Sequence, residues 1–82
     1  MANRSEADFL RIDSEVALTL SGIALGATDE ETRTRTTIAA RKAFDSIARL
    51  RWRTELTDAQ REKLDTDLQQ LQTELRSLGQ II

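Results

Sequence analysis

Residues 57–79 read TDAQREKLDTDLQQLQTELRSLG, and this stretch decides the fold. Its apolar positions step alternately by four and three residues, with polar residues between them; they are Leu64, Leu68, Leu71, Leu75 and Leu78. A step that averages about 3.5 residues places these leucines along one face of an α-helix and is typical of left-handed, coiled-coil-like packing. The stretch therefore predicts a helix that packs through a narrow leucine seam.

Both ends of this helix carry their own signals. Thr57 stands three residues before Gln60, a spacing at which each side chain satisfies a free backbone N–H of the other residue. Gly79 follows the last leucine, where a left-handed residue commonly ends a helix. The sequence thus predicts a helix over about residues 58–78.

Similar signals divide the rest of the chain into two more helices. Thr28 precedes Glu31, and Ser5 precedes Asp8, by the same three residues. Gly26 is placed to end the first helix in a left-handed conformation. We therefore expect helices over about residues 5–25 and 28–53.

The apolar spacing of these two segments also steps by three and four. In the first segment the positions are Phe9, Ile12, Val16, Thr19 and Ile23, and in the second they are Thr36, Ala40, Ala43, Ile47 and Leu50. We expect these positions to face a common core, with antiparallel neighbours because the connections are short. The prediction is an all-α, antiparallel up-down-up three-helix bundle with coiled-coil-like packing, forming a single helical domain over residues 1–82.

Composition argues against most kinds of chemistry. The chain has neither His nor Cys, which removes the commonest metal ligands and the usual general base near neutral pH. Paired acids such as Asp65 and Asp67 stand two apart on a helix and diverge by about 200°, so they do not converge on one proton or metal. We expect no enzyme activity, no cofactor, no metal and no small-molecule substrate. The apolar stretch at 17–27 is too short to span a bilayer, so we expect no membrane partner. With no Cys to indicate an oxidising compartment and no signal-peptide pattern in the first residues, a cytoplasmic location is the default expectation.

Basic residues gather in the predicted second helix. Residues 33–53 carry seven Arg or Lys against a single acid, Asp45, although the net charge of the whole chain is −2. At about 100° per residue, four of them share the side of the helix that lies away from its apolar residues; they are Arg35, Lys42, Arg49 and Arg53. This basic stripe is either a solvated or partner-facing surface that complements acids elsewhere, or a track for a phosphate backbone. Since the chain as a whole is acidic and offers no row of aromatic residues for base stacking, we favour the first interpretation.

A possible interface lies on the first helix. Leu18 and Leu25 fall about 160–180° from the expected core side, with Leu10 at the flank. No charged residue occurs between Val16 and Thr28, where a solvated helix face should carry some. With two apolar residues of the second helix, the candidate interface comprises Leu10, Leu18, Leu25, Ile38 and Trp52.

These observations predict a small non-enzymatic helical protein that acts as a protein–protein interaction module. It would work as a homo-oligomer, most simply a homodimer, or with a helical protein partner. The alternative is a nucleic-acid-associated protein that uses the basic stripe.

Overall fold

Each of the three helices begins at a side chain that caps its free backbone N–H groups. The computed structural model describes residues 5–82 and contains α1 (Glu6–Gly26), α2 (Glu30–Leu50), a short 3-10 turn η1 (Arg51–Arg53) and α3 (Asp58–Ser77). Ser5 caps α1, and Thr57 and Gln60 form the expected reciprocal box at the start of α3, with N–H···O distances of 2.9 and 3.1 Å. The cap of α2 is Asp29, whose Oδ2 accepts from the Thr32 N–H at 2.8 Å. The prediction of Thr28 was wrong, because a carboxylate one residue later occupies the position that reaches this N–H.

The two predicted glycine ends differ. Gly79 adopts a φ of 92° at the end of α3. The N–H groups of Gly79 and Gln80 donate to the carbonyls of Arg76 and Leu75, which closes the last turn. Gly26 is instead the last residue of α1, and the chain leaves through an extended Ala27. Its predicted left-handed role was wrong, because an extended residue makes this connection without a positive φ.

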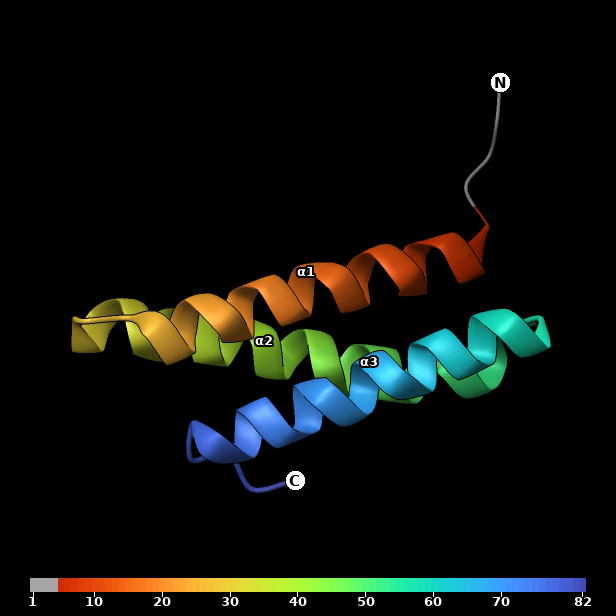
Figure 1. Cartoon of the computed structure of the whole chain (residues 1–82). Coiled ribbons are helices and arrows are strands. Elements are labelled where there is room, and N and C mark those ends of the chain that lie inside the picture. Colours follow the sequence, from red (N-terminus) through yellow and green to blue (C-terminus); the bar gives the residue numbers. More distant parts are fainter. Residues whose placement is uncertain (1–4) are drawn as a thin grey trace.

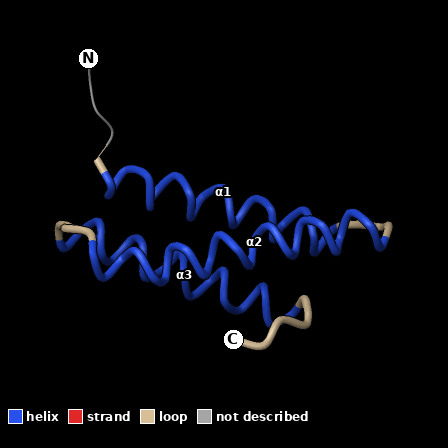
Figure 2. The backbone as a smooth tube through the Cα atoms, turned by 180° about the vertical axis from the view of Figure 1, so that it is seen from behind, coloured by secondary structure: helices blue, strands red, loops and turns tan. Residues whose placement is uncertain are grey.

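The helices form an antiparallel up-down-up bundle, as the sequence predicts. α1 and α2 run alongside each other as a hairpin, and α3 returns in the direction of α1 (Figures 1 and 2). α1 packs against both other helices, whereas the contact between α2 and α3 is less extensive. Both views show α3 diverging toward its C-terminal end, so that the tip of the hairpin extends beyond it. None of the helices in the described part of the chain has an apolar stretch long enough to cross a bilayer.

Two clusters of buried side chains make up the core. The first contains Leu10, Ile47, Leu64 and Leu68, and the second contains Ala17, Ala40, Leu71 and Leu75. The leucine seam of α3 is thus confirmed as the common element of both clusters. On α2 the predicted side also faces the core at Ala40 and Ile47, although Leu50 at its end is exposed.

α1 presents a different side to the core from the one that its sequence predicts. Its buried residues again step by four and three, but they are mostly small: Leu10, Ser14, Ala17, Ser21 and Ala24. The predicted core residues Phe9, Val16 and Ile23 are 51%, 50% and 46% exposed. The prediction failed because it ranked positions by apolar size, whereas this bundle brings α1 close to its neighbours through small side chains.

Two polar layers accompany those small residues between α1 and α3. Ser14 Oγ lies 3.2 Å from Asp67 Oδ2, and Lys63 Nζ lies 2.7 Å from both oxygens of the same carboxylate. One heptad further along, Ser21 Oγ donates to Glu74 Oε1. Gln70 Nε2 also donates to this carboxylate, to Oε2 at 3.0 Å. Each layer satisfies a carboxylate that α3 places next to its leucine seam, so the acids fit inside the bundle.

Candidate interaction surface

The side of the α1–α2 hairpin that faces away from α3 carries the apolar residues that the core does not use. On α1, Ser14 marks the side toward α3, and Val16 lies about 160° from it around the helix. On α2, Arg41 Nη1 lies 3.2 Å from Gln80 Oε1 in the segment after α3, and Ala39 lies about 160° from Arg41. Val16 and Ala39 therefore share the side of the hairpin opposite α3.

We call this side the open face and define it by two rows of residues. The α1 row consists of Phe9, Ile12, Val16 and Ile23, and the α2 row consists of Thr32, Ala39, Ser46 and Leu50. Phe9 and Leu50 line one hollow together, which shows that the rows adjoin. The α1 row is large and protrudes, whereas the α2 row is small except at Leu50. The open face thus sets large side chains of α1 beside mostly small side chains of α2, with a hollow at the end near Phe9 and Leu50.

The residues of the sequence-predicted interface do not form this surface. Leu10 is only 3% exposed and belongs to the first core cluster, and Leu18 packs against the second cluster. The predicted exposure of Leu10 and Leu18 was therefore wrong. The cause is the same as for the core of α1, because the small residues of this helix face inward and bring these two leucines with them. Leu18 lies toward the core rather than away from it. Leu25, seven residues later, lies on the same side of α1 but is exposed.

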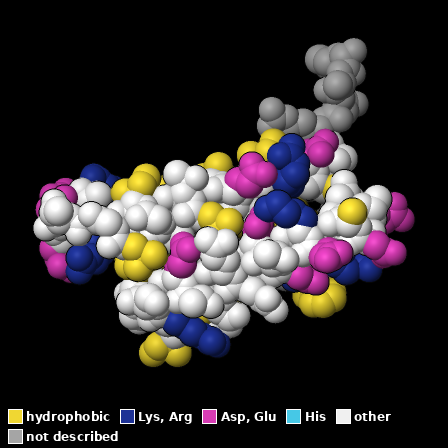
Figure 3. Space-filling model, in the orientation of Figure 1, with side chains coloured by type: hydrophobic (Ala, Val, Ile, Leu, Met, Phe, Trp, Pro, Cys, Tyr) yellow, Lys and Arg dark blue, Asp and Glu magenta, His cyan; other side chains and the backbone are white. Residues whose placement is uncertain are grey.

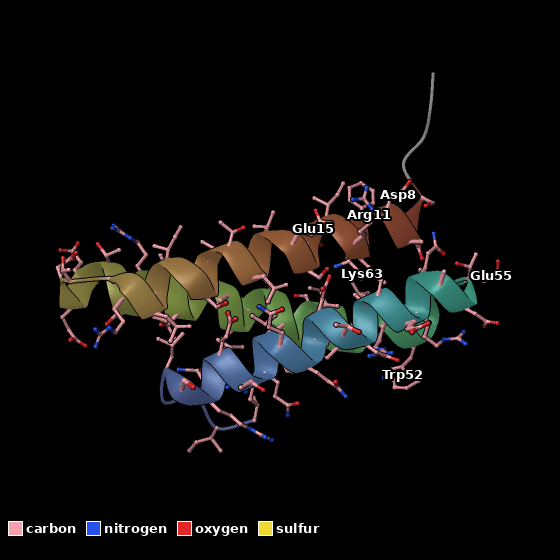
Figure 4. The ribbon with its side chains drawn as sticks, in the orientation of Figure 1. Asp8, Arg11, Glu15, Trp52, Glu55 and Lys63 are labelled. Carbon is pink, nitrogen blue, oxygen red and sulfur yellow. The ribbon has the colours of Figure 1, made fainter. Side chains whose placement is uncertain are left out.

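The other three residues of that prediction are exposed but lie in separate places. Leu25 is near the hairpin tip, and Ile38 lies among polar residues of α2 alone. Trp52 lies in η1 at the other end of the molecule, where it points away from the helices (Figure 4). The Arg51 guanidinium stacks 5.0 Å from its ring and also pairs with Asp65 of α3. These residues therefore do not make one patch.

The basic stripe lies next to the open face. Arg35, Lys42, Arg49 and Arg53 are all exposed, and Arg53 belongs to η1 rather than to α2. Arg35 lies 4.0 Å from Glu31 of its own helix. Within residues 5–82, Lys42, Arg49 and Arg53 have no carboxylate within ion-pair distance. The stripe is thus free to meet charges from outside the chain.

Acids occupy the other edge of the open face. Asp8 and Glu15 lie along the N-terminal half of α1, on either side of Arg11 (Figure 4). Arg11 Nη1 lies 3.4 Å from Glu15 Oε1, and both side chains are about half exposed. An exposed pair of this kind is worth little, so Glu15 remains available to a partner. The open face therefore has acids at its α1 edge, where Asp8 also lines the hollow toward α3, and a basic edge on α2. A further exposed acid, Asp13, lies between the two rows in the hollow of Phe9 and Leu50.

Outside the open face, the described surface shows a hollow between α1 and α3 and scattered apolar side chains. A hollow of about 200 Å³ lies between α1 and α3, where Leu10, Leu56 and Leu64 line it and Lys63 and Asp67 lie at its edge. This volume is below the range of about 300–1,000 Å³ that holds small molecules, whereas other hollows on the described surface measure about 340 to 600 Å³. On the side that shows α1 and α3, hydrophobic side chains are scattered among charged ones (Figure 3). Within residues 5–82, no three Asp or Glu side chains gather closely enough to hold a metal ion.

The exposed apolar row of α1 is the feature that sequence reasoning assigned to the core. The sequence did contain a sign that this row lies outside. Ser14 and Ser21 of α1 are seven residues apart, and so are their partners Asp67 and Glu74 of α3. No protein-family model matches the sequence, and no curated protein or solved structure matches the chain.

Proposed function

We propose that this chain is a non-enzymatic interaction module that docks a protein surface on its open face. The observation that supports this most directly is the α1 row, in which Phe9, Val16 and Ile23 repeat every seven residues and remain about half exposed. A helix with one buried seam ordinarily keeps its outer side polar. A second apolar seam on the outer side suggests a second packing partner, since contiguous exposed apolar patches mark interaction sites.

The lack of Cys allows a direct test of this proposal. A single Cys is introduced at Val16 in the open face, and in a matched variant at Glu62, which is exposed on α3. Alkylation rates are compared between the dilute purified chain and the cells that naturally make it. We expect protection in the cell at position 16 and not at position 62, because a docked partner covers only the open face. Equal rates at position 16 in both settings would overturn the proposal.

A further inference from the structure

The two core clusters give the approximate register of α1 against α2 along the bundle. Leu10 shares a cluster with Ile47, and one heptad further along Ala17 shares a cluster with Ala40. Two residues before Leu10 is Asp8, and two residues after Ile47 is Arg49. The acidic edge of the open face is therefore level with its basic edge.

The same register holds one heptad further along. Glu15 precedes Ala17 by two residues, and Lys42 follows Ala40 by two. Asp8 is thus level with Arg49 and Glu15 with Lys42, but within one chain these residues occupy opposite edges of the face. The acids and bases can meet only between two molecules, when the open face of a second copy packs face to face on the first.

We infer that the occupant of the open face is a second copy of this chain, related by a two-fold axis that runs parallel to the helices between α1 and α2. This inference rests on the proposed docking function and names its partner. Such an axis leaves every level unchanged and places α1 of each copy on α2 of the other. Asp8 and Glu15 of one copy then meet Arg49 and Lys42 of the second, and the two-fold makes four ion pairs in all.

The apolar rows agree with the same arrangement. Phe9, Val16 and Ile23 of one copy come to lie near Ser46, Ala39 and Thr32 of the second, each about two residues or 3 Å from its own level along the helix. Large side chains therefore face small ones, as in knobs-into-holes packing. The two-fold contact joins two hairpins into a four-helix layer, with one α3 on each outer side.

The area is sufficient for a weak to moderate dimer. A helix of 21 residues is about 31 Å long, and two helices side by side are about 20 Å wide. Each copy would contribute about 600 Å² of projected area, near the lower end of specific interfaces. We therefore expect dissociation in the micromolar range rather than the nanomolar range.

A two-fold axis perpendicular to the helices is the competing arrangement. It would place α1 on α1 and α2 on α2, and the unpaired bases Lys42 and Arg49 would then face the same stripe of the second copy. Like charges at an interface disfavour association. The charges at the two edges thus favour the parallel axis, although this axis also brings the exposed Asp13 of each copy, which lies beside Phe9, toward the same residue of the other copy.

Charge reversal with sedimentation analysis tests this inference, from about 10 to about 500 µM chain. Glu15→Lys and Lys42→Glu should each weaken the dimer at least about tenfold, because each opposes like charges at two symmetric contacts. Mixing the two single variants should restore a heterodimer, since both of its cross-pairs again join an acid and a base. Glu15→Lys also removes the ion pair between Arg11 and Glu15. Losing that pair would weaken the variant in any mixture, so it cannot account for recovery of the dimer. Glu62→Lys is the matched control and should leave the dimer unchanged, and circular dichroism confirms that every variant is folded.

The outcomes separate the inference from the proposed function. A dimer that resists both charge reversals but dissociates in Val16→Glu would overturn the two-fold register while leaving the open face as a docking site. A chain that stays monomeric at the highest concentration would overturn the second copy as partner, and the cysteine protection test then decides the function on its own. Rescue in the mixture, with each variant alone monomeric, supports the inference.

Discussion

Ser14 of α1 and Asp67 of α3 lie at the same level of the bundle, and the Ser14 hydroxyl is 3.2 Å from the Asp67 carboxylate. Ser21 and Glu74 repeat this relationship one heptad further along. Asp67 is only 4% exposed, so its oxygens depend on protein donors. These two layers determine which side of α1 faces α3, and the apolar row of α1 is left outside as a result.

The first prediction concerns the pair of Lys63 and Asp67. Lys63→Met should lower the free energy of unfolding by about 1–3 kcal/mol, because it leaves a buried carboxylate with fewer donors. Adding Asp67→Leu should recover most of this loss, since apolar replacement of a buried pair is often neutral or stabilising. Urea unfolding of both single variants and the double variant measures the coupling. Purely additive effects would show that the two groups do not depend on each other.

The second prediction concerns the small residues of α1. Ala17→Leu should destabilise the bundle by about 1–3 kcal/mol, because Ala17 is fully buried beside Ala40 and added methylenes overpack the contact. Gly22→Ala in the same helix should stabilise it by about 0.5–1 kcal/mol, since nothing lies within 4 Å of an added Cβ. Thermal unfolding compares the two. Tolerance of Leu at position 17 would contradict the observed facing of α1.

The third prediction concerns pH and the cap of α2. The hydrogen bond from the Thr32 N–H holds the pKa of Asp29 below its ordinary value of 3.8. A lowered folded-state pKa means that the carboxylate stabilises the fold above about pH 4 and loses this effect as the pH falls through its folded value. Asp29→Asn keeps a capping oxygen without a titrating group. The stability of the parent chain relative to this variant, measured by urea unfolding, should therefore decline as the pH falls below about 5 and through the lowered folded-state pKa.

Thr28 provides the control for that cap. Because Asp29 holds the cap position, Thr28→Ala should leave the urea midpoint unchanged, whereas Thr57→Ala should cost about 0.5–2 kcal/mol. If Thr28→Ala lowers the free energy of unfolding as much as Thr57→Ala does, α2 begins at Thr28, as the sequence predicts.

The fourth prediction concerns a buried hydroxyl. Thr37 Oγ1 is buried and has no hydrogen-bond partner. Thr37→Val keeps the branched shape and removes the unsatisfied group, so it should raise the free energy of unfolding by up to about 1–2 kcal/mol. Thr36→Val is the matched comparison, because Thr36 Oγ1 already donates to the Thr32 carbonyl at 2.7 Å. A lower stability of Thr37→Val than of Thr36→Val would show that the hydroxyl is satisfied in solution.

The fifth prediction concerns nucleic acid. We expect only weak, salt-sensitive binding of DNA or RNA at physiological ionic strength, because the stripe offers few phosphate contacts on a chain whose net charge is −2. Fluorescence anisotropy with duplex and single-stranded probes measures this. Submicromolar binding that is lost in an Arg35/Lys42/Arg49→Glu variant would favour the nucleic-acid alternative.

The sequence predicted where the helices lie better than which side of each helix is buried. Leu64, Leu68, Leu71 and Leu75 form the only large apolar stripe of α3, so periodicity alone places them inside. On α1 two stripes compete, and transfer free energy favours the larger residues at Phe9, Val16 and Ile23. The smaller stripe is inside because Ser14 and Ser21 each meet a carboxylate on α3, and this pairing depends on how two distant segments align. The open face could not be predicted until the facing of α1 was known.

The divergence of α3 makes the molecule unequally protected along its length. At the layer of Ala17, Ala40 and Leu71 all three helices contribute buried side chains, whereas the hairpin tip around Ala27 extends beyond α3 (Figure 1). Opening the tip exposes a contact between two helices only, so it requires less free energy than separating the middle layer. Amide hydrogens in the last turn of α1 and the first turn of α2 are therefore expected to exchange with solvent through local opening. Those beside Ala17 and Leu71 should exchange only when the whole bundle unfolds.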